Sequence, residues 1–176
     1  MALIGISGRA GSGKDTAGSM LVNKYGFTRI AFGDYLKWHC KKYHNWNGQK
    51  DEAGRKLLQE QGTDIHRTAD NDVWVKYAKL DLDMLKVDGI TNIVITDMRF
   101  PNEFDFVREN GGTTVRINGR KYDMGEAENH PSEIALDNHK FHYTIDNSSS
   151  VDELEKKIDY MLDAEISLGR LGYFEN

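Results

Sequence analysis

The residues best suited to chemistry form a phosphate-binding loop of the Walker A type near the start of the chain. Glycines let backbone N–H groups converge on a phosphate without Cβ clashes, and a following helix adds free N–H groups and the positive end of its dipole. A lysine then supplies a mobile charge for the β- and γ-phosphates. The spacing G-x-x-x-x-G-K occurs here. The predicted nucleotide-binding set is Gly8, Arg9, Ala10, Gly11, Ser12, Gly13, Lys14, Asp15 and Thr16.

One position departs from the usual loop. The Ser or Thr that normally follows the lysine and holds Mg²⁺ is replaced by Asp15, and Thr16 comes one residue later. Either residue is therefore a predicted Mg²⁺ contact, directly or through water. A glycine-rich turn that binds nothing is the structural alternative. The apolar run before the loop (residues 2–6) and the helical spacing after it favour nucleoside triphosphate binding.

A second acidic candidate ends an apolar run at residues 92–97. Such a run predicts a buried parallel strand beside the phosphate loop, so that Asp97 would meet Mg²⁺ directly or through water. Arg99, two residues later, would point into the same crevice. Arg67 lies in a helical stretch and could hold a phosphate with both arms of its guanidinium, although on its own a solvated helix charge is the better interpretation.

Two further candidates flank predicted strands. Asp34 follows the strand at residues 27–32 and starts a helix, at the sheet edge where open α/β folds bind ligands. Asp34 could cap the N-terminus of this helix, contact the acceptor substrate, or do both. Arg116, Arg120 and Lys121 belong to a basic segment around a later strand. They would neutralise charge as a phosphoryl group moves beneath a closing lid, and an ordinary charged turn is the alternative.

Composition narrows the class of protein. A chain of 176 residues forms about one domain, and a net charge of −5 with a pI near 5.7 disfavours nucleic acid as the main partner. The single cysteine, Cys40, excludes an intrachain disulfide and indicates a reducing compartment. No apolar run approaches the length that spans a membrane, and the N-terminal run lacks a charged region before it. These features predict a cytoplasmic protein that binds no membrane.

The elements that must position these residues alternate between strand and helix. This order predicts an α/β fold with a five-stranded parallel sheet flanked by helices, and a site at the carboxyl ends of the strands. The predicted strands cover residues 2–6, 27–32, 92–97, 113–117 and 141–145.

With these motifs in this order, the chain resembles the bacteriophage deoxynucleoside monophosphate kinases, a branch of the P-loop kinases. The shared motifs run in order from residue 5 to residue 160, and Asp15 agrees with this family. They are Gly13-Lys14-Asp15-Thr16, the segment 31–37, Leu58-Gln59 with Gly62-Thr63-Asp64 and Arg67, the segment 97–103, Gly111-Gly112, His130-Pro131-Ser132-Glu133 and Ile145-Asp146-Asn147.

The resemblance implies a three-layer P-loop kinase fold in a single domain, residues 1–176. The acceptor-binding helical segment would cover about residues 34–70 and a lid-like segment about 118–133. The implied reaction transfers the γ-phosphoryl group of ATP, with Mg²⁺, to a deoxynucleoside monophosphate and yields the diphosphate. The implied catalytic residues are Lys14, Asp34, Arg67, Asp97, Arg99 and Arg120; Arg116 and Asn147 join the nucleotide-binding set, and Asp15, Thr16 and Asp97 form the metal set.

Two other functions stay open. Related phage kinases phosphorylate hydroxymethyl-pyrimidines within DNA, and an alcohol acceptor of that kind needs a base, for which Asp34 is the candidate. DNA is a partner only in that case. A nucleotide-binding switch without catalysis is the third possibility, disfavoured by two candidate phosphate sites. The sequence leaves open which base is accepted and whether the protein is a homodimer.

Overall fold

A computed structural model describes residues 2–119 and 129–171 and contains one five-stranded sheet. All pairings are parallel and the spatial order is β2-β3-β1-β4-β5. Because every strand runs the same way, the carboxyl ends lie along one edge, where open α/β sheets bind ligands. The strands are β1 (Ala2–Ser7), β2 (Thr28–Ile30), β3 (Asn92–Met98), β4 (Thr113–Gly119) and β5 (Tyr143–Asn147).

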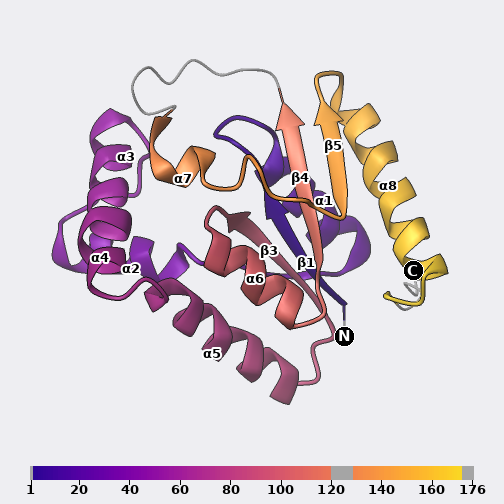
Figure 1. The fold of residues 1–176 in the computed structure, drawn as a ribbon, viewed down its shortest axis with the longest axis horizontal. Coiled ribbons are helices and arrows are strands. Elements are labelled where there is room, and N and C mark those ends of the chain that lie inside the picture. Colours follow the sequence, from indigo (N-terminus) through magenta and orange to yellow (C-terminus); the bar gives the residue numbers. More distant parts are fainter. Residues whose placement is uncertain (1, 120–128, 172–176) are drawn as a thin grey trace.

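Helices cover both faces of the sheet, which makes three layers (Figure 1). One apolar cluster joins the sheet to α2, α5 and α6, and the other joins it to α1 and α8. The helices are α1 (Lys14–Tyr25), α2 (Asp34–Tyr43), α3 (Glu52–Gln59), the π-helix η1 (Glu60–Ile65), α4 (His66–Ala69), α5 (Val73–Val87), α6 (Pro101–Glu109), α7 (Pro131–Ile134) and α8 (Val151–Ser167).

The central strands explain why the sheet needs both layers. In β3, Ile93 and Ile95 enter the α5 and α6 cluster while Val94 enters the α1 and α8 cluster. All three side chains are fully buried. A strand buried on both faces is apolar at every position rather than at alternate ones, which is the pattern that predicted this strand. The prediction of a five-stranded parallel sheet flanked by helices is confirmed.

All five strands differ from the sequence prediction at a boundary: β1 and β3 each extend one residue further, β4 extends two residues further, and β2 and β5 differ at both ends. β2 covers only Thr28–Ile30 instead of residues 27–32, because the N–H group of Phe32 donates to the Asp97 side chain and not to a neighbouring strand. β5 begins at Tyr143 rather than at residue 141 and continues to Asn147. Among the helices in the described ranges, none is long and apolar enough to cross a membrane.

Candidate active site

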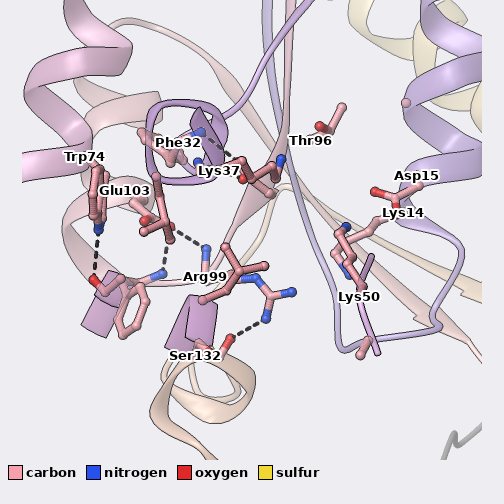
Figure 2. Close-up of a pocket in the computed structure, with 18 of the residues that line it drawn as sticks. Lys14, Asp15, Phe32, Lys37, Lys50, Trp74, Thr96, Arg99, Glu103 and Ser132 are labelled. Carbon is pink, nitrogen blue, oxygen red and sulfur yellow. Dashed lines mark hydrogen bonds between the residues drawn. The ribbon is translucent and has the colours of Figure 1, made fainter. Parts of the chain in front are cut away.

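A cavity of about 640 Å³ opens at the carboxyl edge of the sheet (Figure 2). In this view Lys14 and Asp15 lie toward one end, Trp74 lies toward the other, and Arg99 lies between them. The lining residues come from the loop after β1, the helices α1 and α2, the turn after β2, the α3–α5 region, the end of β3, the start of α6 and the start of α7. The residues of the lining that bear on the chemistry are Lys14, Asp15, Lys37, Arg67, Trp74, Asp97, Arg99 and Glu133.

The glycine loop is held open by a side chain from β5. Gly13 has φ +95°, and a Cβ added there would lie 2.1 Å from the Nδ2 atom of Asn147. That same Nδ2 donates to the Ser12 carbonyl oxygen at 2.9 Å. Only glycine combines this backbone angle with so close a neighbour. Asn147, implied as a nucleotide contact by the family resemblance, therefore supports the loop from its protein side.

Lys14 begins α1 and is buried beside the loop. Its Nζ donates to the Arg9 carbonyl oxygen at 3.2 Å. Burial, and then the charge of Arg99, lower the pKa of Lys14 to about 8. The Ser12 hydroxyl is buried and has no hydrogen-bond partner within the described part of the chain. A cation destabilised by burial and an unsatisfied hydroxyl, on a loop rich in free N–H groups, fit a polyphosphate ligand.

Two of the three predicted metal ligands line the cavity and one does not. Asp15 lines the cavity, whereas Thr16 is exposed and does not belong to the lining. Asp97 lines it too, and its carboxylate accepts the N–H groups of Phe32 at 2.8 Å and Gly33 at 2.9 Å. Asp97 thus fixes the turn after β2, a task that the sequence did not indicate.

Mg²⁺ is usually bound by one or two carboxylates together with substrate phosphates and water. Asp15 and Asp97, both at the cavity wall, supply a donor set of that kind. Across residues 2–119 and 129–171, no three His, Cys, Asp or Glu side chains converge on a metal position. The donor chemistry is therefore compatible with Mg²⁺ held jointly with a nucleotide.

The Asp34 side chain forms ion pairs with neighbouring residues and does not line the cavity. Both of its carboxylate oxygens accept from Arg29, at 2.7 and 3.1 Å, and Lys37 donates at 2.9 Å. Burial alone would raise the pKa of Asp34, but the hydrogen bonds from Arg29 and Lys37 lower it. A carboxylate that is paired twice and has a lowered pKa is a weak proton acceptor. The structure thus places this predicted site residue beside the cavity and gives it a pairing role.

Arg67 is buried, so the interpretation of a solvated helix charge is wrong for it. One of its guanidinium nitrogens donates to Glu103, and the other donates to the Asn71 carbonyl oxygen at 3.0 Å. The remaining Glu103 oxygen accepts the N–H groups of Arg99 and Phe100 at 2.6 and 3.1 Å. Glu103 therefore ties the α4 segment to the turn after β3.

Arg99 reaches the middle of the cavity, as predicted for a residue beside Asp97 (Figure 2). Its guanidinium donates to the carbonyl oxygen of Ser132 at 3.0 Å and pairs with the carboxylate of Glu133. Glu133 also accepts the N–H group of Ala10, in the glycine loop, at 2.8 Å. One carboxylate thus joins the end of β3 to the phosphate loop.

The two arginines that flank the loop share another carboxylate. Arg9 and Arg116 each donate to a different oxygen of Asp137, both at 2.5 Å. The structure brings these two predicted nucleotide-binding residues together at one carboxylate. Arg120 lies outside the described residues, as does most of the lid-like segment 118–133.

Sequence reasoning missed the carboxylates that organise the cations. Glu103 and Glu133 were visible only as members of shared motifs, with no chemistry assigned to them. Their side chains are 3% and 4% exposed, so each needs the arginine that it contacts. Trp74 is buried in the core and also lines the cavity, with its indole N–H donating to the Gly62 carbonyl oxygen at 2.9 Å.

Part of the cavity wall is apolar. Its aromatic and aliphatic side chains come from α2, α3, α5 and the turns after β2 and β3, and a π-helix, which frequently marks functional sites, forms part of the rim. A planar, largely apolar group with an anionic attachment fits such a wall beside Arg99. The apolar lining residues are Phe32, Leu36, Leu58, Trp74 and Phe100.

Comparison with known proteins agrees with this geometry. A sequence model of the deoxynucleotide monophosphate kinase family matches residues 41–158. A protein of Acanthamoeba polyphaga mimivirus named "Putative deoxynucleotide monophosphate kinase" is 31% identical over 184 residues, which cover 90% of this chain and 94% of the relative. An uncharacterized protein, ORF77, of Ictalurid herpesvirus 1 is 29% identical over 160 residues, covering 90% and 69%.

Solved structures share the fold at low sequence identity. An unliganded sugar kinase from Janibacter aligns with a TM-score of 0.56 and 13% identity, covering 93% of this chain and 95% of that one. Shikimate kinase from Acinetobacter baumannii aligns with a TM-score of 0.51 and 13% identity, covering 94% of each. These likenesses establish the three-layer P-loop kinase fold. Together with the family match over most of its length, they show that this chain belongs to the deoxynucleotide monophosphate kinase family.

Proposed function

We propose that the protein transfers the γ-phosphoryl group of ATP to a deoxynucleoside monophosphate and releases ADP and the deoxynucleoside diphosphate. The observation that supports this most directly is the shared cavity. It contains the glycine loop with Lys14 and, further along, Arg99 next to an apolar wall. One cavity thus offers a polyphosphate position and a second, separate position for a phosphate that carries a base.

At the donor end, the loop N–H groups and Lys14 would hold the β- and γ-phosphates of ATP. Transfer passes through a loose transition state, so catalysis depends on alignment and charge neutralisation. Arg9 and Arg116 stand beside the loop, where they would bind the triphosphate from outside. Mg²⁺, when bound, would neutralise phosphate charge, and Asp15 with Asp97 would hold it.

At the acceptor end, Arg99 would bind the acceptor phosphate and aim it at the γ-phosphorus. Arg67 would support this position from the wall, because its pairing with Glu103 also fixes the turn that carries Arg99. The apolar wall would receive the base. We assign residues 34–70 to the acceptor side on the same basis. The lid-like role of residues 118–133 rests on the family resemblance alone, because most of this segment lies outside the described residues.

An acceptor phosphate is already anionic, so this reaction needs no general base. The alcohol acceptor of the alternative function would need one, and the paired state of Asp34 with its lowered pKa argues against that residue. A switch without catalysis would have no use for the second cationic position at Arg99. These observations support the monophosphate kinase over both alternatives.

The test is ADP release from ATP and Mg²⁺ with each of the four deoxynucleoside monophosphates supplied in turn. We expect release to depend on at least one monophosphate and to vanish in Lys14→Ala. Release that ignores every monophosphate but responds to DNA with hydroxymethylated bases would replace the proposal with the alcohol acceptor. Nucleotide binding without acceptor-dependent release would favour the switch.

A further inference from the structure

The motif His130-Pro131-Ser132-Glu133 has no role in the proposed reaction, yet its segment contacts both the phosphate loop and Arg99. The Glu133 carboxylate accepts hydrogen bonds from the Ala10 N–H group and the Arg99 guanidinium. Four residues later, the Asp137 carboxylate accepts hydrogen bonds from Arg9 and Arg116. Two carboxylates of one short segment thus occupy four donors that the reaction assigns to phosphate oxygens.

We propose that Glu133 and Asp137 are resident counter-anions of the phosphate site. They hold its donors before the substrates arrive: Asp137 releases Arg9 and Arg116 to ATP, and Glu133 releases Ala10 to ATP and Arg99 to the acceptor phosphate. The inference rests on the proposed function, because it requires that the loop binds a nucleoside triphosphate. It adds an exchange of partners to that function. The carboxylates take the place of phosphate oxygens, and the phosphates of the two substrates displace them.

The segment is anchored so that both carboxylates face the loop. Leu136, between them, is 1% exposed and belongs to the core cluster under α5 and α6. The Ser132 carbonyl oxygen accepts from Arg99 on the same side. A buried leucine therefore fixes the segment to the core, while Glu133 and Asp137 extend to the cations on either side of it.

Electrostatics explain why such counter-anions are needed. Lys14, Arg99, Arg9 and Arg116 repel one another at the loop, and Arg99 already lowers the pKa of Lys14. The negative charge of Glu133 opposes this lowering of the Lys14 pKa, because Glu133 lies close enough to stabilise the charged lysine. Without an anion the site would be a cluster of positive charge, partly buried, and burial makes that repulsion stronger.

The proposal differs from a purely positioning role in the sign of one effect. If Asp137 only aims Arg9 and Arg116 at phosphate, its removal weakens ATP binding. If Asp137 competes with phosphate for them, its removal strengthens binding, because ATP no longer has to displace it. The Asp137 side chain is 30% exposed, so Asp137→Asn leaves the core packing intact.

The experiment measures the affinity for a non-hydrolysable ATP analogue with Mg²⁺, by calorimetry and without acceptor, in wild type and Asp137→Asn. We expect the variant to bind about two- to fivefold more tightly, the range that a partly exposed ion pair supplies. Glu133→Gln, which keeps an oxygen acceptor for Ala10 but loses its charge, is expected to shift affinity in the same direction at a pH well below the Lys14 pKa of about 8, where Lys14 stays charged without Glu133.

Asp163→Asn is the matched control. It removes the same charge from an exposed position on α8 and corrects for the change in net charge. Binding by Asp137→Asn that equals or falls below that of Asp163→Asn overturns the counter-anion inference while leaving the kinase proposal standing. Absence of analogue binding in the wild type overturns both, and unaltered thermal unfolding of Asp137→Asn excludes misfolding as a cause.

Discussion

Arg67 and Glu103 meet inside the wall of the active-site cavity, where a guanidinium nitrogen of Arg67 donates to a carboxylate oxygen of Glu103. Their side chains are 6% and 3% exposed. The same carboxylate holds the backbone of Arg99 and Phe100. The pair therefore connects the proposed acceptor segment to the end of β3, and its disruption affects both stability and the position of Arg99.

Removing one partner of this pair leaves a buried charge without compensation. We expect Arg67→Met to lower the free energy of unfolding by about 3–5 kcal/mol. The double variant Arg67→Met with Glu103→Met is expected to recover most of that loss, because no charge then remains buried. Urea denaturation of the wild type, both single variants and the double variant measures the coupling. A double variant as unstable as the sum of the singles contradicts the assignment.

Glu103 also makes stability depend on pH. Burial raises its pKa from 4.5 to about 7, in spite of the nearby Arg67. A raised folded-state pKa stabilises the protein fully below pH 4.5, and this contribution is lost as the pH rises through 7. The stability advantage of the wild type over Glu103→Gln should therefore shrink by on the order of 2 kcal/mol between pH 5 and pH 7.5. Parallel stability curves for the two proteins would refute the predicted shift.

Lys14 makes nucleotide binding depend on pH in the alkaline range. Its pKa of about 8 means that the free protein loses this charge above pH 8. Affinity for an ATP analogue should then fall, by up to about tenfold per pH unit above 8, because binding requires the proton to return. Lys14→Arg keeps its charge over the whole range, so its affinity should vary little from pH 7.5 to 9.5. If the affinity of the two proteins for the ATP analogue falls equally steeply with pH, then a group other than Lys14 titrates.

The glycine at the end of the phosphate loop can be tested against a glycine elsewhere. Gly13 and Gly26 both have positive φ, but an added Cβ meets Asn147 at 2.1 Å only at Gly13 and meets no atom within 4 Å at Gly26. Alanine at either position should lower stability by about 1–2 kcal/mol through backbone strain. Gly13→Ala alone should also weaken binding of the ATP analogue, by at least about tenfold. If the two variants bind the ATP analogue with similar affinity, then crowding between an added Cβ at position 13 and the Asn147 side chain has no effect on nucleotide binding.

Asp34 separates the proposed reaction from the transfer to an alcohol. Because Asp34 is paired with Arg29 and Lys37 outside the cavity lining, Asp34→Asn should change kcat with a monophosphate acceptor by no more than about threefold. Loss of a general base typically lowers the rate by about 10²–10⁴-fold. Steady-state rates with the preferred monophosphate distinguish the two, and a fall of that larger size would restore Asp34 as a proton acceptor.

The sequence by itself determined the fold class and the place of the glycine loop at the end of the first strand. The glycine loop, Lys14 and the apolar strand that ends at Asp97 are local patterns, and strand–loop–helix geometry follows from neighbours along the chain. The order of strands and helices was sufficient for a parallel sheet with its site at the carboxyl edge. Motif order was likewise sufficient for the family.

Only the tertiary structure decided how the charges are paired. Arg67 with Glu103, Arg99 with Glu133 and Arg116 with Asp137 are separated by 36, 34 and 21 positions. No local pattern predicts such partners, because they depend on which segments the sheet topology brings together. Burial decided the rest: a charge that would be solvated on an isolated helix must find a partner once the fold removes it from water.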